Sequence, residues 1–139
     1  MENQISDRNF KFLQVVIRVS NLENSINFYQ NILGFRILRQ SEHRDARFTL
    51  VVLGYGQEGH CTTLELIYNW DVQEPYSLGT VFSHIAIGVN NLYSFCDNLV
   101  EHKIKITRPP GPTKQGGNNI IAFIEDPDGY RIELIENKP

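Results

Sequence analysis

Four polar side chains stand in strings of otherwise apolar residues. Gln14 and His84 each precede a run of alternating apolar residues, and Glu65 and Glu133 each stand between apolar neighbours. A polar group on a buried strand face is costly unless it has a partner. Two carboxylates, one imidazole and one amide oxygen suit a divalent first-row metal ion. The residue types indicate a metal centre with room left for water or a chelating substrate.

A repeat relates these four residues. The segment 14–22 resembles 84–92, which lies 70 residues further on, and 64–67 resembles 132–135, which lies 68 residues further on. Two similar blocks in the same order at nearly one offset indicate a duplicated module. Taken singly, each polar residue is more simply a satisfied core residue or a solvent-facing one. The repeat favours the metal site, because it brings copies of one position to a common locus.

Both halves of the chain predict a strand, a helix and three further strands. The alternation over 13–19 is typical of a half-buried strand. Asn21 is the expected cap of the first helix and Gly34 its end, and Asn91 is the expected cap of the second helix. The later strands are predicted at 35–39, 48–53 and 62–68, and at 103–107, 120–125 and 131–136. The expected fold class is α+β, with two βαβββ modules that form an open β-barrel cavity.

The same pattern predicts the domain organisation. We expect a flexible tail at 1–11, a first module at 12–70, a linker at 71–79 and a second module at 80–139. An isolated module would leave sheet edges and an apolar face exposed, so the modules must pair within one chain or between two.

Composition excludes several classes of function. The 139 residues carry a net charge of −3, so nothing points to nucleic acid or to an anionic membrane. No apolar run approaches the roughly 20 residues of a membrane span, and the polar N-terminus does not resemble a signal peptide. Cys61 and Cys96 form no CxxC pair, which favours free thiols in a reducing compartment. We expect a cytoplasmic protein that acts on a small molecule.

The remaining motifs carry weaker signals. His43, His60 and His102 stand in charged or turn-like stretches and are expected at the surface. The Gly-rich segment 111–117 lacks the spacing of a phosphate-binding loop. It is either a flexible hairpin loop or a lid in which Lys114 offers a cation.

Three strings resemble a known family. The segments 64–70, 79–86 and 122–134 are similar to glyoxalase I, the lactoylglutathione lyases of the vicinal oxygen chelate superfamily. The resemblance extends over about 12–136. The sequence Asp-Pro-Asp-Gly at 126–129 occurs across the superfamily, whereas Glu-Leu-Ile-Tyr-Asn-Trp at 65–70 is more specific to the lyase.

The resemblance implies one divalent metal ion per site. The implied ligands are Gln14, Glu65, His84 and Glu133. Compact bacterial members of the family use nickel or cobalt, whereas glutamine at the first ligand position resembles the zinc-using members. Both choices of metal stay open.

The resemblance also implies a reaction, the isomerisation of the hemithioacetal of methylglyoxal and glutathione to S-lactoylglutathione. Glu133 is the expected base, and Glu65 is its symmetric counterpart. Arg18 and Asn69 match positions that hold glutathione. The family further implies a homodimer whose sites take Gln14 and Glu65 from one chain and His84 and Glu133 from the other.

One position departs from the family pattern. Some members carry an arginine four residues before the ligand histidine, and this chain has Thr80 there. Lys114 is therefore the expected partner for a glutathione carboxylate.

Two alternatives remain. The first is another enzyme of the superfamily, namely an epimerase, a thiol transferase or a ring-cleaving dioxygenase. The thiol transferases and dioxygenases use two histidines and one glutamate, so Gln14 counts against them. The second is a protein that sequesters a drug without metal chemistry, which would have no reason to keep four matched ligands.

Overall fold

The computed structural model describes residues 8–114 and 117–138. Contacts divide the chain into two compact units, and the division falls between Pro75 and Tyr76. Each unit has the predicted order of one strand, a helix and three strands. Residues 1–7 of the predicted tail lie outside the described residues.

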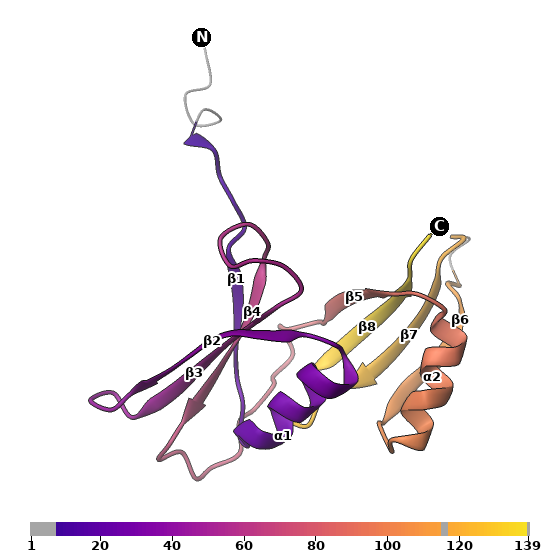
Figure 1. Cartoon of the computed structure of the whole chain (residues 1–139). Helices are drawn as coiled ribbons and strands as arrows, with labels where there is room; N and C mark the ends of the chain where they lie inside the picture. Colours follow the sequence, from indigo (N-terminus) through magenta and orange to yellow (C-terminus); the bar gives the residue numbers. More distant parts are fainter. Residues whose placement is uncertain (1–7, 115–116, 139) are drawn as a thin grey trace. The chain divides into compact units, whose positions relative to one another are not determined.

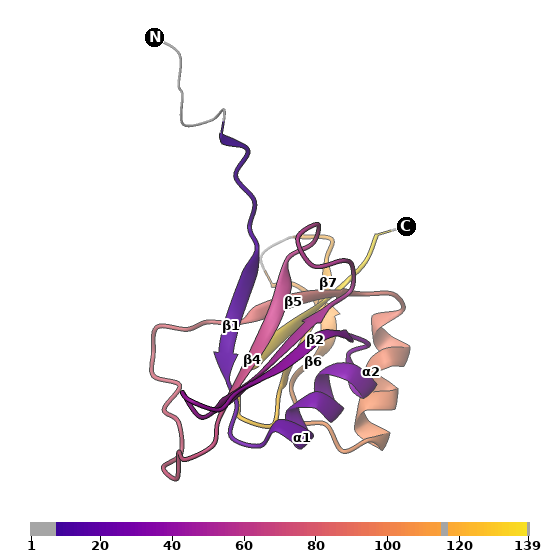
Figure 2. The same cartoon turned by 60° about the vertical axis from the view of Figure 1, so that its left-hand side comes forward.

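The first unit holds a four-stranded sheet (Figures 1 and 2). Its elements are β1 (Gln14–Arg18), α1 (Leu22–Ile26), the π-helix η2 (Asn27–Ile32), β2 (Arg36–His43), β3 (Phe48–Gly54) and β4 (Thr63–Asn69). The strand order is β1-β4-β3-β2, with β1 parallel to β4 and the other pairs antiparallel. Strand β2 runs four residues beyond the end predicted at Arg39.

The first helix begins at its predicted cap and stops before Gly34 as predicted, but its second half differs in geometry. The Asn21 side chain accepts a hydrogen bond from the Asn24 backbone N–H at 2.9 Å, which confirms the predicted cap. The second half widens into a π-helix, in which the N–H of Leu33 donates to the carbonyl of Phe28 at 3.1 Å. Gly34 follows at φ +73°, a left-handed conformation that glycine adopts without strain.

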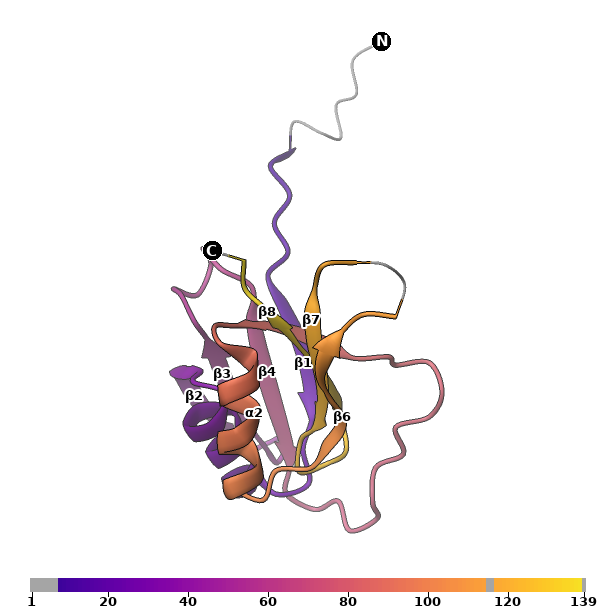
Figure 3. The same ribbon diagram turned by 90° about the vertical axis from the view of Figure 1, so that its right-hand side faces the viewer.

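The second unit repeats this topology (Figures 1 and 3). Its elements are β5 (Ile85–Val89), α2 (Leu92–Glu101), β6 (Ile106–Pro112), β7 (Ile120–Glu125) and β8 (Arg131–Glu136). The strand order is β5-β8-β7-β6, with β5 parallel to β8. The duplication predicted from the sequence is therefore present in the strand order of the two sheets.

Strand β6 departs from its predicted bounds of 103–107. It begins at Ile106, because Lys103 takes a left-handed conformation at φ +59° where helix α2 ends. It then continues to Pro112, into the segment predicted as a loop. The Arg108 guanidinium supports this extension by donating to the carbonyls of Gly111 at 3.0 Å and Ile121 at 2.8 Å.

The start of helix α2 also differs in detail. Asn91 stands at the cap position, but its side chain caps nothing. The N–H of Leu92 instead donates to Oε1 of Glu136 at 3.2 Å. The cap thus comes from the end of β8, 44 residues later in the chain.

Each sheet has two distinct faces. In the first unit Leu66 pairs with Ile17 on one side and with Val51 on the other, and all three are buried. The neighbouring row on the opposite face joins Val16 to Glu65. Successive residues of a strand point to opposite faces, so the register decides which side chains share a surface with Glu65.

None of the helices formed by the described residues is long and apolar enough to span a membrane. Both cysteines are free, as predicted, and the structure shows Cys61 exposed and Cys96 buried.

Candidate functional site

Strands β1 and β4 place all four predicted residues of the first unit on one face. Val16 is the register partner of Glu65, and Gln14 and Arg18 lie two residues to either side of Val16. Asn69 follows Glu65 by four residues on the same strand, so it also belongs to this face. The predicted ligands and the predicted thiol-binding residues of this unit therefore share one surface.

Glu65 is a buried carboxylate with an unsatisfied oxygen. Its residue is 4% exposed, and Oε2 has no hydrogen-bond partner among the described residues. Burial raises the pKa of the Glu65 carboxyl, although the charge of Arg39 partly offsets this. A buried anionic oxygen without a partner is costly, so this position calls for a proton or a cation.

Sequence reasoning missed Arg39, whose charge acts on Glu65. Arg39 pairs with Val52, and Val52 pairs with Glu65, so the three lie in one row across the sheet. The Arg39 guanidinium also forms an ion pair with Glu58 at 3.0 Å. No sequence signal marks Arg39, because a register shift between Ile37 and Arg39 decides its place in the row.

The second unit brings its two predicted ligands into contact. Ala86 is the register partner of Glu133, and His84 precedes Ala86 by two residues. The imidazole Nε2 of His84 lies 3.2 Å from Oε1 of Glu133. The other ring nitrogen, Nδ1, lies 2.7 Å from the hydroxyl oxygen of Ser83, a residue that the sequence did not single out.

The four predicted ligands thus occur as one pair in each unit. No group of three or more His, Cys, Asp or Glu side chains suited to a metal ion is found within residues 8–114 and 117–138. The donor set nevertheless fits a divalent ion. Two neighbouring ligand atoms bound at about 2.1 Å are about 3.0 to 3.4 Å apart, which includes the His84–Glu133 separation. The unsatisfied oxygen of Glu65 would also suit coordination to a divalent ion.

The end of β4, where Asn69 lies, is held by contacts that the sequence did not reveal. The indole N–H of Trp70 donates to the Thr49 hydroxyl at 2.8 Å. Arg47 forms a bidentate ion pair with Asp71 and lies over the Trp70 ring. These contacts restrict the position of the neighbouring Asn69 backbone.

Lys114 and Thr80 are both exposed. Lys114 stands two residues past β6, and Thr80 lies in the turn that precedes β5. Both belong to the second unit, whereas Arg18 and Asn69 belong to the first. Residues 115 and 116 of the predicted lid lie outside the described residues. His43, His60 and His102 are exposed, as predicted.

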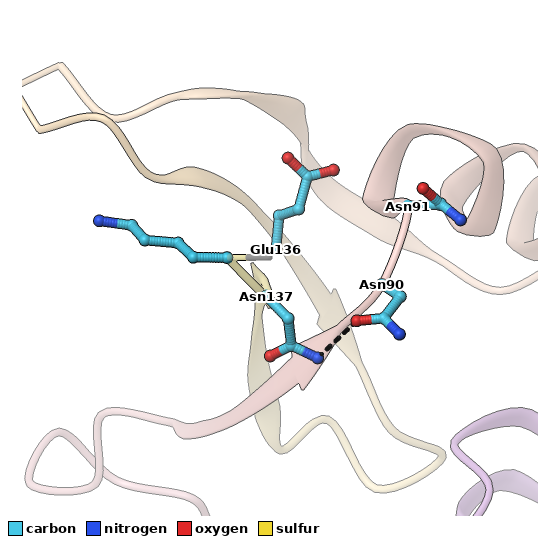
Figure 4. A pocket seen from close by; sticks show the side chains of 5 residues that line it. Asn90, Asn91, Glu136 and Asn137 are labelled. Carbon is cyan, nitrogen blue, oxygen red and sulfur yellow. Dashed lines mark hydrogen bonds between the residues drawn. The ribbon is translucent and has the colours of Figure 1, made fainter.

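A cavity of about 460 Å³ opens in the second unit at the C-terminal end of β5, whereas His84 precedes the N-terminal end of that strand. Its lining residues are Asn90, Asn91, Glu136, Asn137 and Lys138. Asn137 and Asn90 point toward one another, and the Asn137 amide donates to the Asn90 side-chain oxygen at 3.0 Å (Figure 4). The repeat offsets match Arg18 to Gly88 and Asn69 to Asn137. At the position equivalent to Arg18 the second unit therefore has a glycine and no cationic side chain.

A smaller cavity of about 300 Å³ lies in the first unit next to β1. It is formed by the segments 11–13 and 59–62, which include the exposed Cys61. The predicted site residues are not part of its lining.

Comparison with known proteins defines the family. The model of the Glyoxalase/Bleomycin resistance protein/Dioxygenase superfamily matches residues 11–134. The chain belongs to this superfamily. It is also 47% identical over 128 residues to the lactoylglutathione lyase of Haemophilus influenzae, a match that covers 92% of this chain and 93% of that protein.

Solved structures give the same result. Glyoxalase I from Zea mays superposes with a TM-score of 0.86 at 40% identity over 93% of this chain. The match covers 45% of the maize chain, so this chain spans about half the length of that enzyme. The trypanothione-dependent glyoxalase I of Leishmania major gives a TM-score of 0.80 at 38% identity, over 92% of this chain and 87% of that one. The predicted resemblance and the α+β fold with paired modules are confirmed.

Proposed function

We propose that the protein isomerises the hemithioacetal of methylglyoxal and glutathione to S-lactoylglutathione with the help of a divalent metal ion. The observation that carries this proposal is the matched placement of Glu65 and Glu133. Glu65 lies opposite Val16, two residues after the predicted ligand Gln14. Glu133 lies opposite Ala86, two residues after the predicted ligand His84. The similarity to lactoylglutathione lyases over most of the chain supports the same activity.

Four residues would hold the metal ion, namely Gln14, Glu65, His84 and Glu133. When bound, the ion supplies Lewis-acid stabilisation of the negative charge that develops on the two vicinal oxygens of the substrate. Nickel or cobalt is the proposed ion, with zinc as the alternative because a glutamine stands at position 14.

Glu133 is the proposed base. The reaction removes a proton from a carbon next to a carbonyl and returns one to the neighbouring carbon, so a carboxylate must come within hydrogen-bond reach of the carbon that loses its proton. Glu133 is only partly exposed, and its Oε1 faces the ring of His84. Glu65 is its counterpart and serves the other carbon or the other stereoisomer of the adduct.

Arg18, Asn69 and Lys114 would hold the glutathione arm. Glutathione carries carboxylates, which an arginine and a lysine bind through charge-assisted hydrogen bonds. Binding at a distance from the reacting carbon orients that carbon against the base. The superfamily tolerates different thiols, since the Leishmania major relative is trypanothione-dependent.

The proposed assembly is a homodimer with shared sites. Each described unit carries one pair of the four ligands, so a complete set requires one pair from each kind of unit. In the proposed dimer, Gln14 and Glu65 of one chain meet His84 and Glu133 of the partner chain. The free thiols of Cys61 and Cys96 suit the reducing cytoplasm in which we place the enzyme.

A reconstitution assay tests the proposed function. Metal-free protein is loaded separately with nickel, cobalt and zinc and is given glutathione and methylglyoxal, while the absorbance of the thioester product is followed. We expect turnover with at least one metal and none without metal. Absence of thioester with all three would overturn the proposal. A protein that binds no metal would favour the drug-sequestering alternative.

A further inference from the structure

Three contacts define one orientation of the His84 ring. The Ser83 hydroxyl oxygen lies 2.7 Å from Nδ1, and Oε1 of Glu133 lies 3.2 Å from Nε2. The ring also meets Phe123 edge to face, with 5.3 Å between the ring centroids. Phe123 is the register partner of Glu133, so it belongs to the same strand face. A half-turn of the ring would replace Nδ1 by a carbon and break the Ser83 contact.

The hydrogen positions follow from the chemistry of the two partners. A carboxylate oxygen only accepts hydrogen bonds, and a neutral imidazole carries a single N–H. The contact with Glu133 is therefore satisfied when the hydrogen is on Nε2. Nδ1 is then an acceptor, and the Ser83 hydroxyl donates to it. In the metal-free protein this arrangement satisfies both ring nitrogens of His84.

Ligation of a metal ion through Nε2 requires the opposite arrangement. The Nε2 lone pair must then be free, so one proton leaves Nε2 and one arrives at Nδ1. The ring stays neutral and no net proton is gained or lost. A hydroxyl is both a donor and an acceptor, so the Ser83 hydroxyl can rotate and accept the new Nδ1–H.

We propose that Ser83 is a positioning residue for His84. Its hydroxyl holds the His84 ring in one orientation and forms a hydrogen bond with Nδ1 in both tautomers of the ring. The inference rests on the proposed function, because it takes His84 as a metal ligand. Histidine ligands donate their second N–H to a partner that fixes the ring, and loss of such a partner typically lowers metal affinity about 10- to 100-fold. Ser83 is the group within reach of Nδ1 that can do this.

Zinc affinity of the full chain, measured by competition with a chromophoric chelator, tests the proposal first. We expect Ser83→Ala to bind zinc about tenfold more weakly, and Ser83→Thr, which keeps the hydroxyl, to stay within about threefold of wild type. The matched control is Ser94→Ala, since the Ser94 hydroxyl donates to a backbone carbonyl at the start of α2. Zinc binding by Ser83→Ala within about twofold of wild type would overturn the proposal.

Nitrogen-15 NMR of the labelled histidine rings provides a second test, which needs no variant of Ser83. The His84 signals are identified as those missing from a His84→Gln sample. In wild type we expect hydrogen on Nε2 without metal and on Nδ1 with zinc bound. The same tautomer in both states would refute the exchange, even if Ser83→Ala failed to fold.

Neither measurement uses a substrate. A loss of zinc affinity in Ser83→Ala, in a protein that forms no thioester with any metal, would overturn the proposed lyase activity and leave the role of Ser83 intact. Lyase activity in the wild-type protein, together with unchanged zinc affinity in Ser83→Ala, would support the proposed function and overturn the role of Ser83.

Discussion

Glu65 and Glu133 hold the same register position in the two units. Glu65 lies opposite Val16 across a parallel strand pair, and Glu133 lies opposite Ala86 across the equivalent pair. Their surroundings differ, because one oxygen of Glu65 is buried without a hydrogen-bond partner in the described structure, whereas Glu133 contacts His84. The duplication has thus placed two equivalent carboxylates in two chemical settings, and this difference underlies the first prediction.

Glu133→Gln should abolish turnover while metal binding weakens but persists. An amide oxygen can still ligate a metal ion, but it cannot accept the proton from the substrate carbon. Loss of a general base costs about 100-fold or more in rate. The steady-state rate and the metal content of the purified variant check this. The control is Glu125→Gln, which removes a carboxylate that pairs with Lys105. More than about a tenth of wild-type activity in Glu133→Gln would remove Glu133 from the role of base.

Arg18→Ala should mainly raise the KM for the thiol adduct. Arg18 shares the face of Gln14 but stands four residues from it. Its proposed role is therefore to bind the arm of the substrate and not its reacting carbon. A matched control is Arg44→Ala, which removes an exposed arginine of the same unit. Initial rates over a range of adduct concentrations separate the two constants. An unchanged KM with a collapsed kcat would contradict the assignment.

Subunit mixing should restore activity to two inactive variants. In a dimer with shared sites, a chain with Glu65→Ala and a chain with Glu133→Ala together form one site with both lesions and one intact site. Refolding the two variants together should recover up to about a quarter of wild-type activity, if half of the dimers are mixed. Each variant refolded alone is the control. No recovery after verified exchange of chains would refute the shared site.

Tyr55 should make the stability of the protein depend on alkaline pH. Tyr55 is 51% exposed, but partial burial at its hydroxyl raises the pKa of the phenol to about 12, and this hydroxyl donates to the carbonyl of Leu33 at 2.6 Å. A raised pKa means that the folded protein favours the neutral phenol. This contribution to stability is complete below pH 10, the ordinary value, and is lost as pH rises through about 12.

The matched variant is Tyr55→Phe, which keeps the ring that stacks on Phe35 and removes the hydroxyl. Denaturant unfolding between pH 9 and about 12 should show a weaker fall in stability for this variant than for wild type. The difference in phenolate absorbance between the two proteins should titrate near pH 12. A difference that titrates near the ordinary value of 10 would contradict the prediction.

Glu136→Ala should destabilise the second unit by about 1 kcal/mol, the usual cost of losing a helix cap. The Glu136 carboxylate accepts the hydrogen bond of the Leu92 N–H at the start of α2. Denaturant unfolding measures the effect, and Glu136→Gln, which keeps an acceptor oxygen, should lose less. Glu101→Gln at the other end of α2 is the control. Equal stability of Glu136→Ala and wild type would show that the cap contributes nothing.

Local pattern in the sequence determined much of this protein. The repeat and the cap at Asn21 follow from the sequence pattern, and the structure confirms them. The alternation over 13–19 is followed only in part, because Ile17 and Val19 are buried whereas Leu13 and Val15 are exposed. The family follows from strings such as 64–70, which the comparisons support. The faces of Gln14 and Glu65 could be inferred as well, because a strand has a period of two. The roles of the four ligands stay predictions.

Only the tertiary structure decided the contacts that join distant parts of the chain. Arg39 reaches the row of Glu65 through a register shift, and Glu136 replaces Asn91 as the cap of α2. Arg108 extends β6 into a segment that the glycines and prolines predicted as a loop. Strand pairing and packing across the unit decide which groups each of these side chains meets. The types and spacing of neighbouring residues in the sequence do not predict those contacts.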